Sequence, residues 1–291
     1  MSTGTLLLTR ADVAGLLDLE ACIDAVEDAF RRHAEGDGPG PGSLGLASAR
    51  GAFHVKAAGL RLSRPWFTAK LNANFPDNPV RLGQPPIRGL IVLCDAETGY
   101  PVAVMDSIEI TIQRTGAATA VAARRLARPD SRVATICGCG NQGAIQLRAL
   151  ANVLPLERAF AFDRDAGEAR RFAVEQSARL VIAVEAVRDL AGAVRESDAV
   201  VTCTPSREFF LERRMVCPGT FIAAVGADNP DKQELEPEHL AAGKVVADVR
   251  DQCAAMGELH RARGRSPLAR GRARRAGGPR HGTQARKDGA G

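Results

Sequence analysis

The sequence predicts an α/β protein in which a doubly wound parallel sheet follows a smaller α+β region. Its 291 residues, 45% of them hydrophobic, are enough for one large or two moderate domains. From Ser131 onward, short β-rich runs alternate with helical patterns, which favours a parallel sheet with helices on both faces. Before Ser131 the strand candidates lie close together in sequence, which is typical of α+β structure.

The composition excludes several classes of protein. Charged residues make up 25% of the chain and aromatic residues 4%, so collagen, coiled coil and wholesale disorder are excluded. No run of 18 apolar residues predicts a membrane span, and residues 1–10 lack the basic start of a signal peptide. The seven cysteines are scattered and show no zinc-ligand spacing. We therefore expect a cytoplasmic protein with reduced thiols and no metal site.

The first elements are expected in the following order. Residues 11–34 show a helical pattern, and residues 36–51, rich in Gly, Pro and Ser, predict a loop. A long Ala-rich helix is expected from Ile108 to Ala127, ending before Pro129. Between the loop and this helix lie four strand candidates, of which the last two form a hairpin: Phe53–Ala58, Trp66–Asn72, Leu90–Cys94 and Pro101–Met105.

The second half begins with the strand Arg132–Cys137, a glycine loop and a helix over Ala144–Val153. The next strand and helix are expected over Ala159–Phe162 and Ala166–Ala178. Five further segments continue the alternation: Val181–Val184, Val187–Ala193, Ala199–Cys203, Phe221–Val225 and Val245–Val249.

The glycine loop has the spacing of a dinucleotide-binding fingerprint and the structural context that the fingerprint requires. Gly138 permits a tight turn, Gly140 leaves room for a pyrophosphate, and Gly143 allows close packing of helix on strand. Asp163 closes the next strand, where a carboxylate accepts the ribose hydroxyls and repels a 2′-phosphate. The loop therefore predicts a Rossmann domain that binds NAD, while the neighbouring Arg164 leaves NADP open.

Other polar residues follow strands or lie in the first half. Thr204 follows the strand Ala199–Cys203, and Asp228 follows Phe221–Val225, so both are expected at the ligand crevice. A carboxylate in this position is suited to proton transfer at an amine or imine carbon. Lys70 and Arg114 are suited to bind a substrate carboxylate. The pattern alone does not bring these residues together, and each taken singly also fits a surface charge.

Over roughly residues 10–260 the chain resembles the ornithine cyclodeaminase/μ-crystallin family. The resemblance is carried by the glycine loop together with Lys70–Asn78, Gly89–Asp106, Arg114-Thr115, and Val225–Asp228 with Lys232 and Glu234-Leu235.

The resemblance implies a homodimer with a separate substrate-binding and dimerisation domain. It implies a division into residues 1–112 for that domain, 113–250 for the Rossmann domain and 251–260 as an incomplete return toward the first domain. The composition of residues 261–291 predicts a basic disordered tail. The resemblance also implies that Lys70 and Arg114 hold the substrate carboxylate and that Asp228 is the acid/base. It further implies dinucleotide contacts by Asn141, Gln142, Asp163, Thr204, Val225 and Lys232, with Arg114 near the nicotinamide end.

The chemistry that the resemblance implies is conversion of L-ornithine to L-proline and ammonia, with the hydride leaving to NAD and returning from it. Two alternatives remain within the fold: an alanine dehydrogenase or a reductase of a cyclic imine, both with net cofactor turnover. A third hypothesis is a non-catalytic dinucleotide-binding or inactivated family member.

The chain departs from the family at three places. Many members carry an Arg on an early strand, and neither Arg50 nor Lys56 is a secure replacement for it. Many members also have a Thr where this chain has Pro86. Residues 261–291 hold ten Lys and Arg and one Asp, so this tail carries +9 and the other 260 residues carry −4. The tail is interpreted as an out-of-frame product, since the resemblance ends near His260. An inert tail and a basic arm for nucleic acid are the alternatives, and the body gives no electrostatic case for a nucleic-acid partner.

Overall fold

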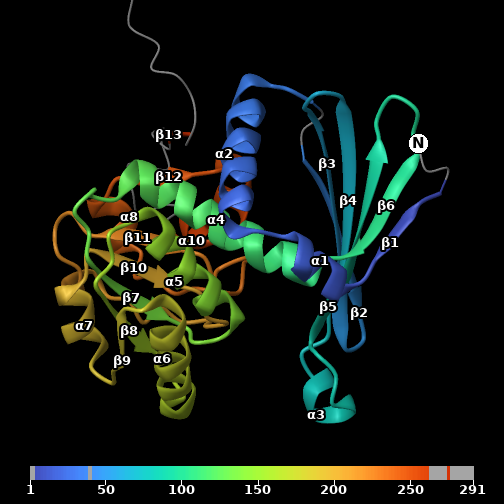
Figure 1. Ribbon diagram of the computed structural model, residues 1–291. Coiled ribbons are helices and arrows are strands. Elements are labelled where there is room, and N and C mark those ends of the chain that lie inside the picture. The colour runs from blue at the N-terminus through green and yellow to red at the C-terminus, as the bar shows by residue number, and fades with distance from the viewer. Residues whose placement is uncertain (1–3, 39–40, 262–273, 276–291) are drawn as a thin grey trace, which may run out of the picture.

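The computed structural model describes residues 4–38, 41–261 and 274–275 (Figure 1). An antiparallel-rich sheet lies on one side of the molecule, a parallel sheet with its helices lies on the other, and a long helix, α4, runs between them (Figure 1). The α/β fold class is therefore confirmed. Residues 262–273 and 276–291, on which the interpretations of the tail depend, lie outside the described residues.

The first half is a six-stranded sheet in the order β1-β6-β5-β4-β3-β2. Its strands pair antiparallel except β1 and β6, which run parallel. The expected hairpin is confirmed, and its turn is held by the Asp95 carboxylate, which accepts from the N–H groups of Glu97 and Thr98. The strands are β1 Leu6–Leu8, β2 Gly42–Ser48, β3 Gly51–Arg61, β4 Pro65–Asn74, β5 Ile87–Asp95 and β6 Pro101–Asp106.

Two expectations for this half are wrong. Residues 42–48 of the expected loop 36–51 are a strand, because β2 pairs along its whole length with β3, opposing Leu44 to Val55 and Leu46 to Phe53. The single helix expected over residues 11–34 is two helices, α1 Arg10–Leu16 and α2 Leu19–Glu35. The chain breaks there because the Asp18 side chain accepts from the Ala21 N–H and starts a new helix. The short strand β1 and helix α3 (Asn78–Leu82) were not expected.

The pairing register gives the sheet two unlike faces. Phe53, Leu71 and Leu90 share one face, and their side chains remain 39%, 44% and 49% exposed. Leu44, Leu46 and Phe67 extend this apolar face and are also exposed. The opposite face carries Lys56, Lys70 and Ile91 at one register position. The first face has the character of an interface, and the second has the character of a binding site.

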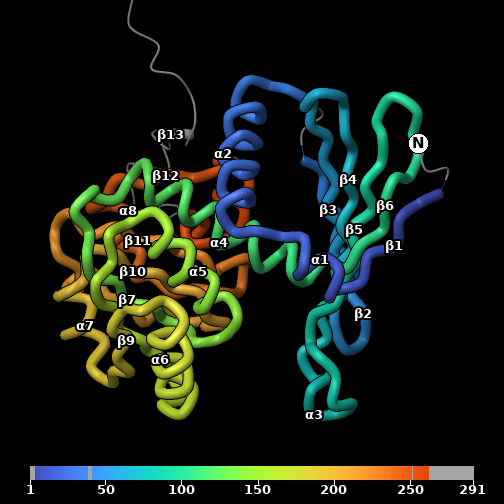
Figure 2. Tube along the Cα trace, in the orientation of Figure 1, coloured from blue at the N-terminus to red at the C-terminus, as the bar shows by residue number. Residues whose placement is uncertain are grey.

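Helix α4 (Ile108–Leu126) joins the two halves (Figure 2). It approaches α5 closely at Gly116, where an added Cβ would lie 2.7 Å from Cγ1 of Ile145. Helix α2 packs against α4 through Ile23, which is fully buried beside Ala117 and Ala120. The expected division between residues 112 and 113 falls inside this continuous helix and stays a prediction.

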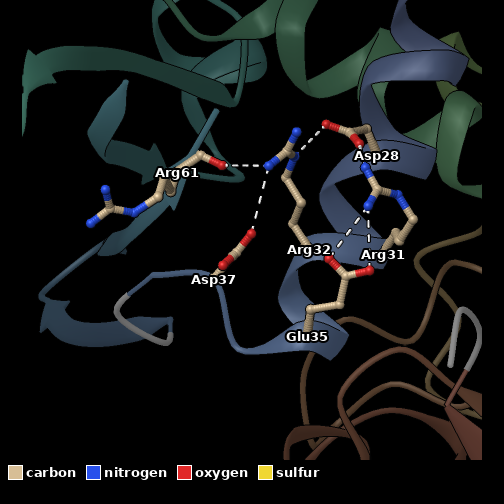
Figure 3. Close-up of polar contacts among 6 residues, drawn as sticks. All are labelled: Asp28, Arg31, Arg32, Glu35, Asp37 and Arg61. Atoms are coloured by element: carbon tan, nitrogen blue, oxygen red, sulfur yellow. Dashed lines mark hydrogen bonds and ion pairs between the residues drawn. The ribbon is translucent and has the colours of Figure 1, made fainter. Parts of the chain in front are cut away.

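An ion-pair cluster fixes the end of α2 to the first sheet. The Arg32 guanidinium donates to Asp28 on its own helix at 2.7 Å and to the backbone carbonyl of Arg61 on β3 at 2.9 Å (Figure 3). It also lies 3.6 Å from the Asp37 carboxylate, just past the helix end. Arg31 bridges Asp28 and Glu35 beside it.

The second half is a parallel sheet in the order β11-β10-β7-β8-β9, which is the Rossmann strand order. Its core has two layers: Ile136, Leu147 and Leu150 pack on one side of the sheet, and Leu190 and Val200 pack on the other. The alternation of strands and helices is therefore confirmed. The elements are β7 Val133–Cys137, α5 Asn141–Val153, β8 Arg158–Phe162, α6 Ala166–Leu180, β9 Ala183–Ala186, α7 Leu190–Glu196, β10 Ala199–Thr202 and β11 Phe221–Ala224.

The expectation that Val245–Val249 adds a further strand to this alternation is wrong. Only Val246–Ala247 form a strand, β12, which pairs parallel with β13 (Arg274–Arg275) in a separate two-stranded sheet. Asp248, just past β12, is close enough to Arg114 for its charge to raise the pKa of the guanidinium. The remaining short elements are η1 Arg213–Met215, α8 Glu238–Ala242, α9 Arg250–Ala255 and α10 Glu258–Arg261. Among the described residues, no helix is long and apolar enough to cross a bilayer.

Candidate active site

The glycine loop connects β7 to α5 at the centre of the parallel sheet. Gly138 has φ +104°, a left-handed conformation that favours glycine, and an added Cβ would lie 2.9 Å from the Cys203 carbonyl oxygen. At Gly143 an added Cβ would lie 2.0 Å from the Gly138 carbonyl oxygen. Both glycines are therefore required for the close packing of the loop, in the roles that the sequence predicts for them.

Gly140 has a different environment, because an added Cβ there would meet no protein atom within 4 Å. It is the N-cap of α5, and no side chain caps this helix. The first N–H groups of a helix lack partners within the helix and carry partial positive charge. The loop therefore offers open space and free donors at one point, which fits a dinucleotide pyrophosphate. Asn141 is exposed at the helix start, and the Gln142 side-chain oxygen is buried with no partner in the described part of the chain.

Asp163 lies at the end of β8, half-buried beside the loop. One carboxylate oxygen accepts from the Cys139 N–H at 2.8 Å, and the other accepts from the Asp165 N–H at 3.0 Å. Asp163 thus stabilises the glycine loop directly. Each carboxylate oxygen has a second lone pair, with which it can accept from a ribose hydroxyl as well. Ribose recognition by Asp163 stays a prediction.

A buried acid, Glu234, connects the ends of the two neighbouring strands. One of its carboxylate oxygens accepts from the Thr204 N–H at 2.6 Å and from the Thr204 hydroxyl at 2.7 Å. The other accepts from the Gly226 N–H at 2.9 Å. The sequence placed Glu234 only within a family motif and did not predict this role. The Thr204 hydroxyl is held by Glu234, so a cofactor contact by Thr204 stays a prediction.

Asp228 and Lys232 lie beyond β11 and form an ion pair, with Lys232 Nζ 2.8 Å from a carboxylate oxygen of Asp228. The Asp228 side chain is 70% exposed, and the Lys232 side chain is 24% exposed. Val225 directly follows β11, and its N–H donates to the Thr202 carbonyl oxygen. The predicted acid/base is therefore solvent-accessible, paired with a cation, and located at the crevice edge of the parallel sheet.

A cavity of roughly 430 Å³ lies between the first sheet and α4. It contains three cationic side chains, Lys56, Lys70 and Arg114, and its walls are mostly apolar. None of its twelve lining residues is acidic. The Thr111 hydroxyl, also in the lining, is buried and has no hydrogen-bond partner among the described residues. The other lining residues are Pro41, Ala57, Ala58, Thr68, Ile91, Leu93, Met105 and Ile110.

The cations in this cavity influence one another. Loss of hydration, with Arg114 and Lys56 nearby, lowers the pKa of Lys70 to about 8. Loss of hydration also lowers the pKa of Arg114, while Asp248 and Asp228 act in the opposite direction. An unsatisfied cluster of positive charge in a mostly apolar cavity is suited to bind an anion such as a carboxylate.

Arg114 is the residue at which the two halves meet. It extends from α4 into the cavity of the first sheet and lies within electrostatic reach of Asp228 and Asp248 from the second half. The structure thus places Lys70 and Arg114 in one cavity, with Asp228 within electrostatic reach of Arg114 alone. Of the two cations considered for the missing early Arg, Lys56 lines the cavity, whereas Arg50 lies in the turn between β2 and β3.

Comparison with known proteins finds dehydrogenases, a reductase and a cyclodeaminase among the relatives of the chain. It is 38% identical over 260 residues to a Rhizobium meliloti protein described as a dehydrogenase, covering 88% of this chain and 78% of that protein. It is 36% identical over 256 residues to alanine dehydrogenase of Archaeoglobus fulgidus, covering 88% and 77%. It is 32% identical over 179 residues to ornithine cyclodeaminase of Agrobacterium tumefaciens, covering 61% of this chain and 50% of that protein.

The solved structures that resemble this chain include enzymes of the same kinds. An archaeal alanine dehydrogenase dimer with bound NAD superimposes with a TM-score of 0.84 at 36% identity, covering 89% of this chain and 78% of that chain. A pyrroline-2-carboxylate reductase of Thermococcus litoralis, in complex with NADH and L-proline, gives a TM-score of 0.82 at 30% identity, covering 89% and 80%.

The match to a family extends over almost the whole chain. The description ornithine cyclodeaminase/mu-crystallin family matches residues 3–271, which reaches past His260 into the arginine-rich segment. Within the described residues, no group of three His, Cys, Asp or Glu side chains is placed to hold a metal ion. The glycine loop, the Lys70–Arg114 cavity and the match over residues 3–271 agree, and the chain belongs to the ornithine cyclodeaminase/mu-crystallin family.

Proposed function

We propose that the chain binds NAD at the glycine loop and catalyses the oxidation of an L-amino acid to its imine, or the reverse reduction, with net turnover of the cofactor. The observation that carries this proposal is the cavity beside α4, which has three cationic side chains and no acid. Such a cavity suits a carboxylate and does not suit the side-chain ammonium of ornithine. The greater coverage of alanine dehydrogenase than of ornithine cyclodeaminase supports the same choice.

The proposed roles of the residues follow from their positions. Lys70 and Arg114 bind the substrate α-carboxylate, and Arg114 supplies a planar pair of donors. A carboxylate beside Lys70 would raise the pKa of this lysine again, because the charged form gains a partner. NAD, when bound, supplies the hydride exchange at the α-carbon.

Asp228 is proposed as the acid/base. It is exposed at the crevice edge, and it lies within electrostatic reach of Arg114, hence near the substrate that Arg114 would hold. Its carboxylate is suited to take a proton from the substrate amine and to return it in the reverse direction. Lys232 holds this carboxylate at 2.8 Å and thereby restricts its orientation.

The exposed apolar face of the first sheet supports a homodimer. Six large apolar side chains on this face are between 39% and 55% exposed, which is more than a stable soluble surface normally leaves in one patch. A second copy of the chain covering this face would leave the cavity on the opposite face accessible. The residues are Leu44, Leu46, Phe53, Phe67, Leu71 and Leu90.

The test is incubation of the purified chain with NAD and L-alanine, and separately with L-ornithine, followed by assay of NADH, ammonia and proline. Net NADH formation with a 2-oxo acid and ammonia supports the proposal. Proline and ammonia from ornithine without net NADH would instead establish cyclodeamination. Binding of NAD with no turnover of any amino acid or cyclic imine would make the chain a non-catalytic family member. Asp228→Asn is the negative control, because it keeps the shape of the side chain and removes the base.

A further inference from the structure

The loop that carries Asp228, residues 226–234, is joined at its two ends. The Gly226 N–H donates to the Glu234 carboxylate at 2.9 Å, so the residues between them project as a closed loop from the edge of the parallel sheet. Inside this loop the Lys232 ammonium pairs with the Asp228 carboxylate at 2.8 Å. This ion pair joins two members of the same loop, so it does not fix the loop relative to the rest of the protein.

Two charged side chains of helix α10 contact this loop from outside. The Glu258 carboxylate accepts from the Glu234 N–H at 2.7 Å, at the end of the loop. The Arg261 guanidinium donates to the Pro230 carbonyl oxygen at 2.7 Å, two residues after Asp228. The first contact is buried, and the second is exposed. Helix α10 is therefore attached to the loop at its end and near its middle.

The turn before α10 packs against the same loop. Gly257 has φ +81°, and an added Cβ would lie 3.1 Å from the Ala227 carbonyl oxygen. Glycine adopts this conformation readily and leaves room for so close an approach. Ala227 precedes Asp228, and Pro230 follows it by two positions, so residues 257–261 contact the backbone on both sides of the acid.

We propose that Glu258 and Arg261 are positioning residues that hold the loop so that the Asp228 carboxylate faces the substrate amine. This inference rests on the proposed function, in which Asp228 is the acid/base. The Asp228 side chain is 70% exposed, so its location depends on the backbone of the loop and not on packing of its own. Neither Glu258 nor Arg261 lines the cavity beside α4, so both act through the loop.

The geometry of proton transfer explains why such a restraint matters. A base must lie within hydrogen-bond reach of the proton that it takes, at about 2.6–3.2 Å between heavy atoms. A loop released from α10 keeps its own closure between Gly226 and Glu234 but presents its carboxylate at this distance less often. The expected result is slower chemistry with unchanged binding, because Lys70 and Arg114 lie on other elements.

The experiment measures kcat and KM for oxidation of L-alanine by NAD in the full chain and its variants. Arg261→Met should lower kcat by about 10- to 100-fold, since a misplacement of about 1 Å can cost this much. The KM for L-alanine and the Kd for NAD should not change. Arg261→Lys should restore part of kcat, because its ammonium can donate to the same carbonyl oxygen.

Arg213→Met is the matched control. The Arg213 guanidinium also donates to a backbone carbonyl oxygen, that of Val216 at 3.0 Å, but this contact lies outside the loop. The control should keep the wild-type kcat. An unchanged kcat in Arg261→Met would overturn the positioning role, and so would an equal loss of kcat in Arg213→Met.

The contact with Glu258 is tested in the same assay, at a temperature where urea denaturation shows the variants to be folded. Glu258→Met removes the acceptor of the Glu234 N–H and should lower kcat. Glu258→Gln should recover most of this loss, because its amide oxygen still accepts. Equal kcat values in Glu258→Met and the wild type would exclude Glu258 from the positioning role.

If the wild type oxidises no amino acid, the proposed function fails, and the restraint on the loop is tested by hydrogen exchange. Exchange of the amides of residues 227–232 that is about tenfold faster in Arg261→Met, with unchanged exchange in the glycine loop, would support the restraint even then. Equal exchange rates in the two proteins would overturn it.

Discussion

Replacement of Glu234 by Gln should lower both the stability of the parallel sheet and its affinity for the cofactor. Glu234 is fully buried, and its two oxygens accept from the Thr204 N–H, the Thr204 hydroxyl and the Gly226 N–H. Gln has the same shape but replaces one acceptor oxygen with an NH2 group. Whichever orientation the amide takes, one half-buried N–H of Thr204 or Gly226 then faces a donor and loses its partner.

The magnitude follows from these three bonds. A hydrogen bond to a charged group contributes about 1.5–3 kcal/mol, and a buried donor without a partner costs about 1–3 kcal/mol. We therefore expect Glu234→Gln to lower the free energy of unfolding by roughly 2–4 kcal/mol. Thr204 and Gly226 follow β10 and β11 next to the glycine loop, so losing their shared anchor should also raise the Kd for NAD by about tenfold, or 1.4 kcal/mol.

The assay pairs urea denaturation with calorimetric titration of NAD at a temperature where the variant is folded. Glu236→Gln is the matched control, because Glu236 accepts from the Arg213 N–H at 2.6 Å and does not contact either strand end. The control should lose stability without loss of NAD affinity. A Glu234→Gln protein with wild-type stability and wild-type Kd would refute the reasoning.

Four further predictions follow from particular positions. Gly140→Ala should weaken NAD binding at unchanged thermal stability, whereas Gly143→Ala should destabilise the fold, because only a Cβ at position 143 would meet protein atoms. Calorimetry of NAD binding and thermal unfolding distinguish the two variants. Equal effects of both substitutions would contradict the different roles given to the two glycines. Leu71→Asp, on the exposed face of β4, should produce a monomer in sedimentation experiments, and a persistent dimer would exclude this face as the interface. Because Lys70 has a pKa of about 8, the affinity for a carboxylic acid that carries no amine should fall as the pH rises through 8. Lys70→Arg should remove this dependence, because arginine stays charged. Calorimetric affinities that do not change with pH in the wild type would contradict this prediction. Burial, followed by the charge of Glu234, raises the pKa of Glu258 to about 7, so the folded state keeps a proton that the unfolded state releases above about 4.5. The free energy of unfolding should therefore fall by up to about 3 kcal/mol from pH 4.5 to 7 and then level off. Urea midpoints of Glu258→Gln should not show this fall.

The parallel half could be predicted from the sequence because its signals are local. Each buried strand is a short apolar run, such as Ala199–Thr202, and each helix has its own period. The strand β2 was missed because its glycines and serines have the composition of a loop. Its stability comes from pairing with β3, which is a non-local interaction that propensity does not report. Val245–Val249 has the composition of a strand, yet only two of its residues pair, and Asp248 is near Arg114 instead.

The same distinction between local and non-local signals applies to the candidate site. Gly138, Gly140 and Gly143 form one continuous motif, so their roles were predictable from spacing. The pairing of Lys56 with Lys70 depends on the register of β3 against β4, and a shift of one residue would move Lys56 to the apolar face. Glu234 is a single acid in a segment without regular structure, so only its burial and its three bonds reveal its function.

The convergence of the two halves depends on α4 more than on any residue of the site. The helix begins beside the first sheet, where the buried Ser107 donates its N–H to the Gly89 carbonyl oxygen and its hydroxyl to the Asn72 side chain. An added Cβ at Gly89 would lie 2.2 Å from that side chain, so only glycine allows this contact. Farther along, Gly116 fixes the helix against α5 in the same way. Arg114 lies between these two anchors, and its position relative to both the carboxylate cavity and Asp228 is therefore set by glycine contacts that carry no charge and no chemistry of their own.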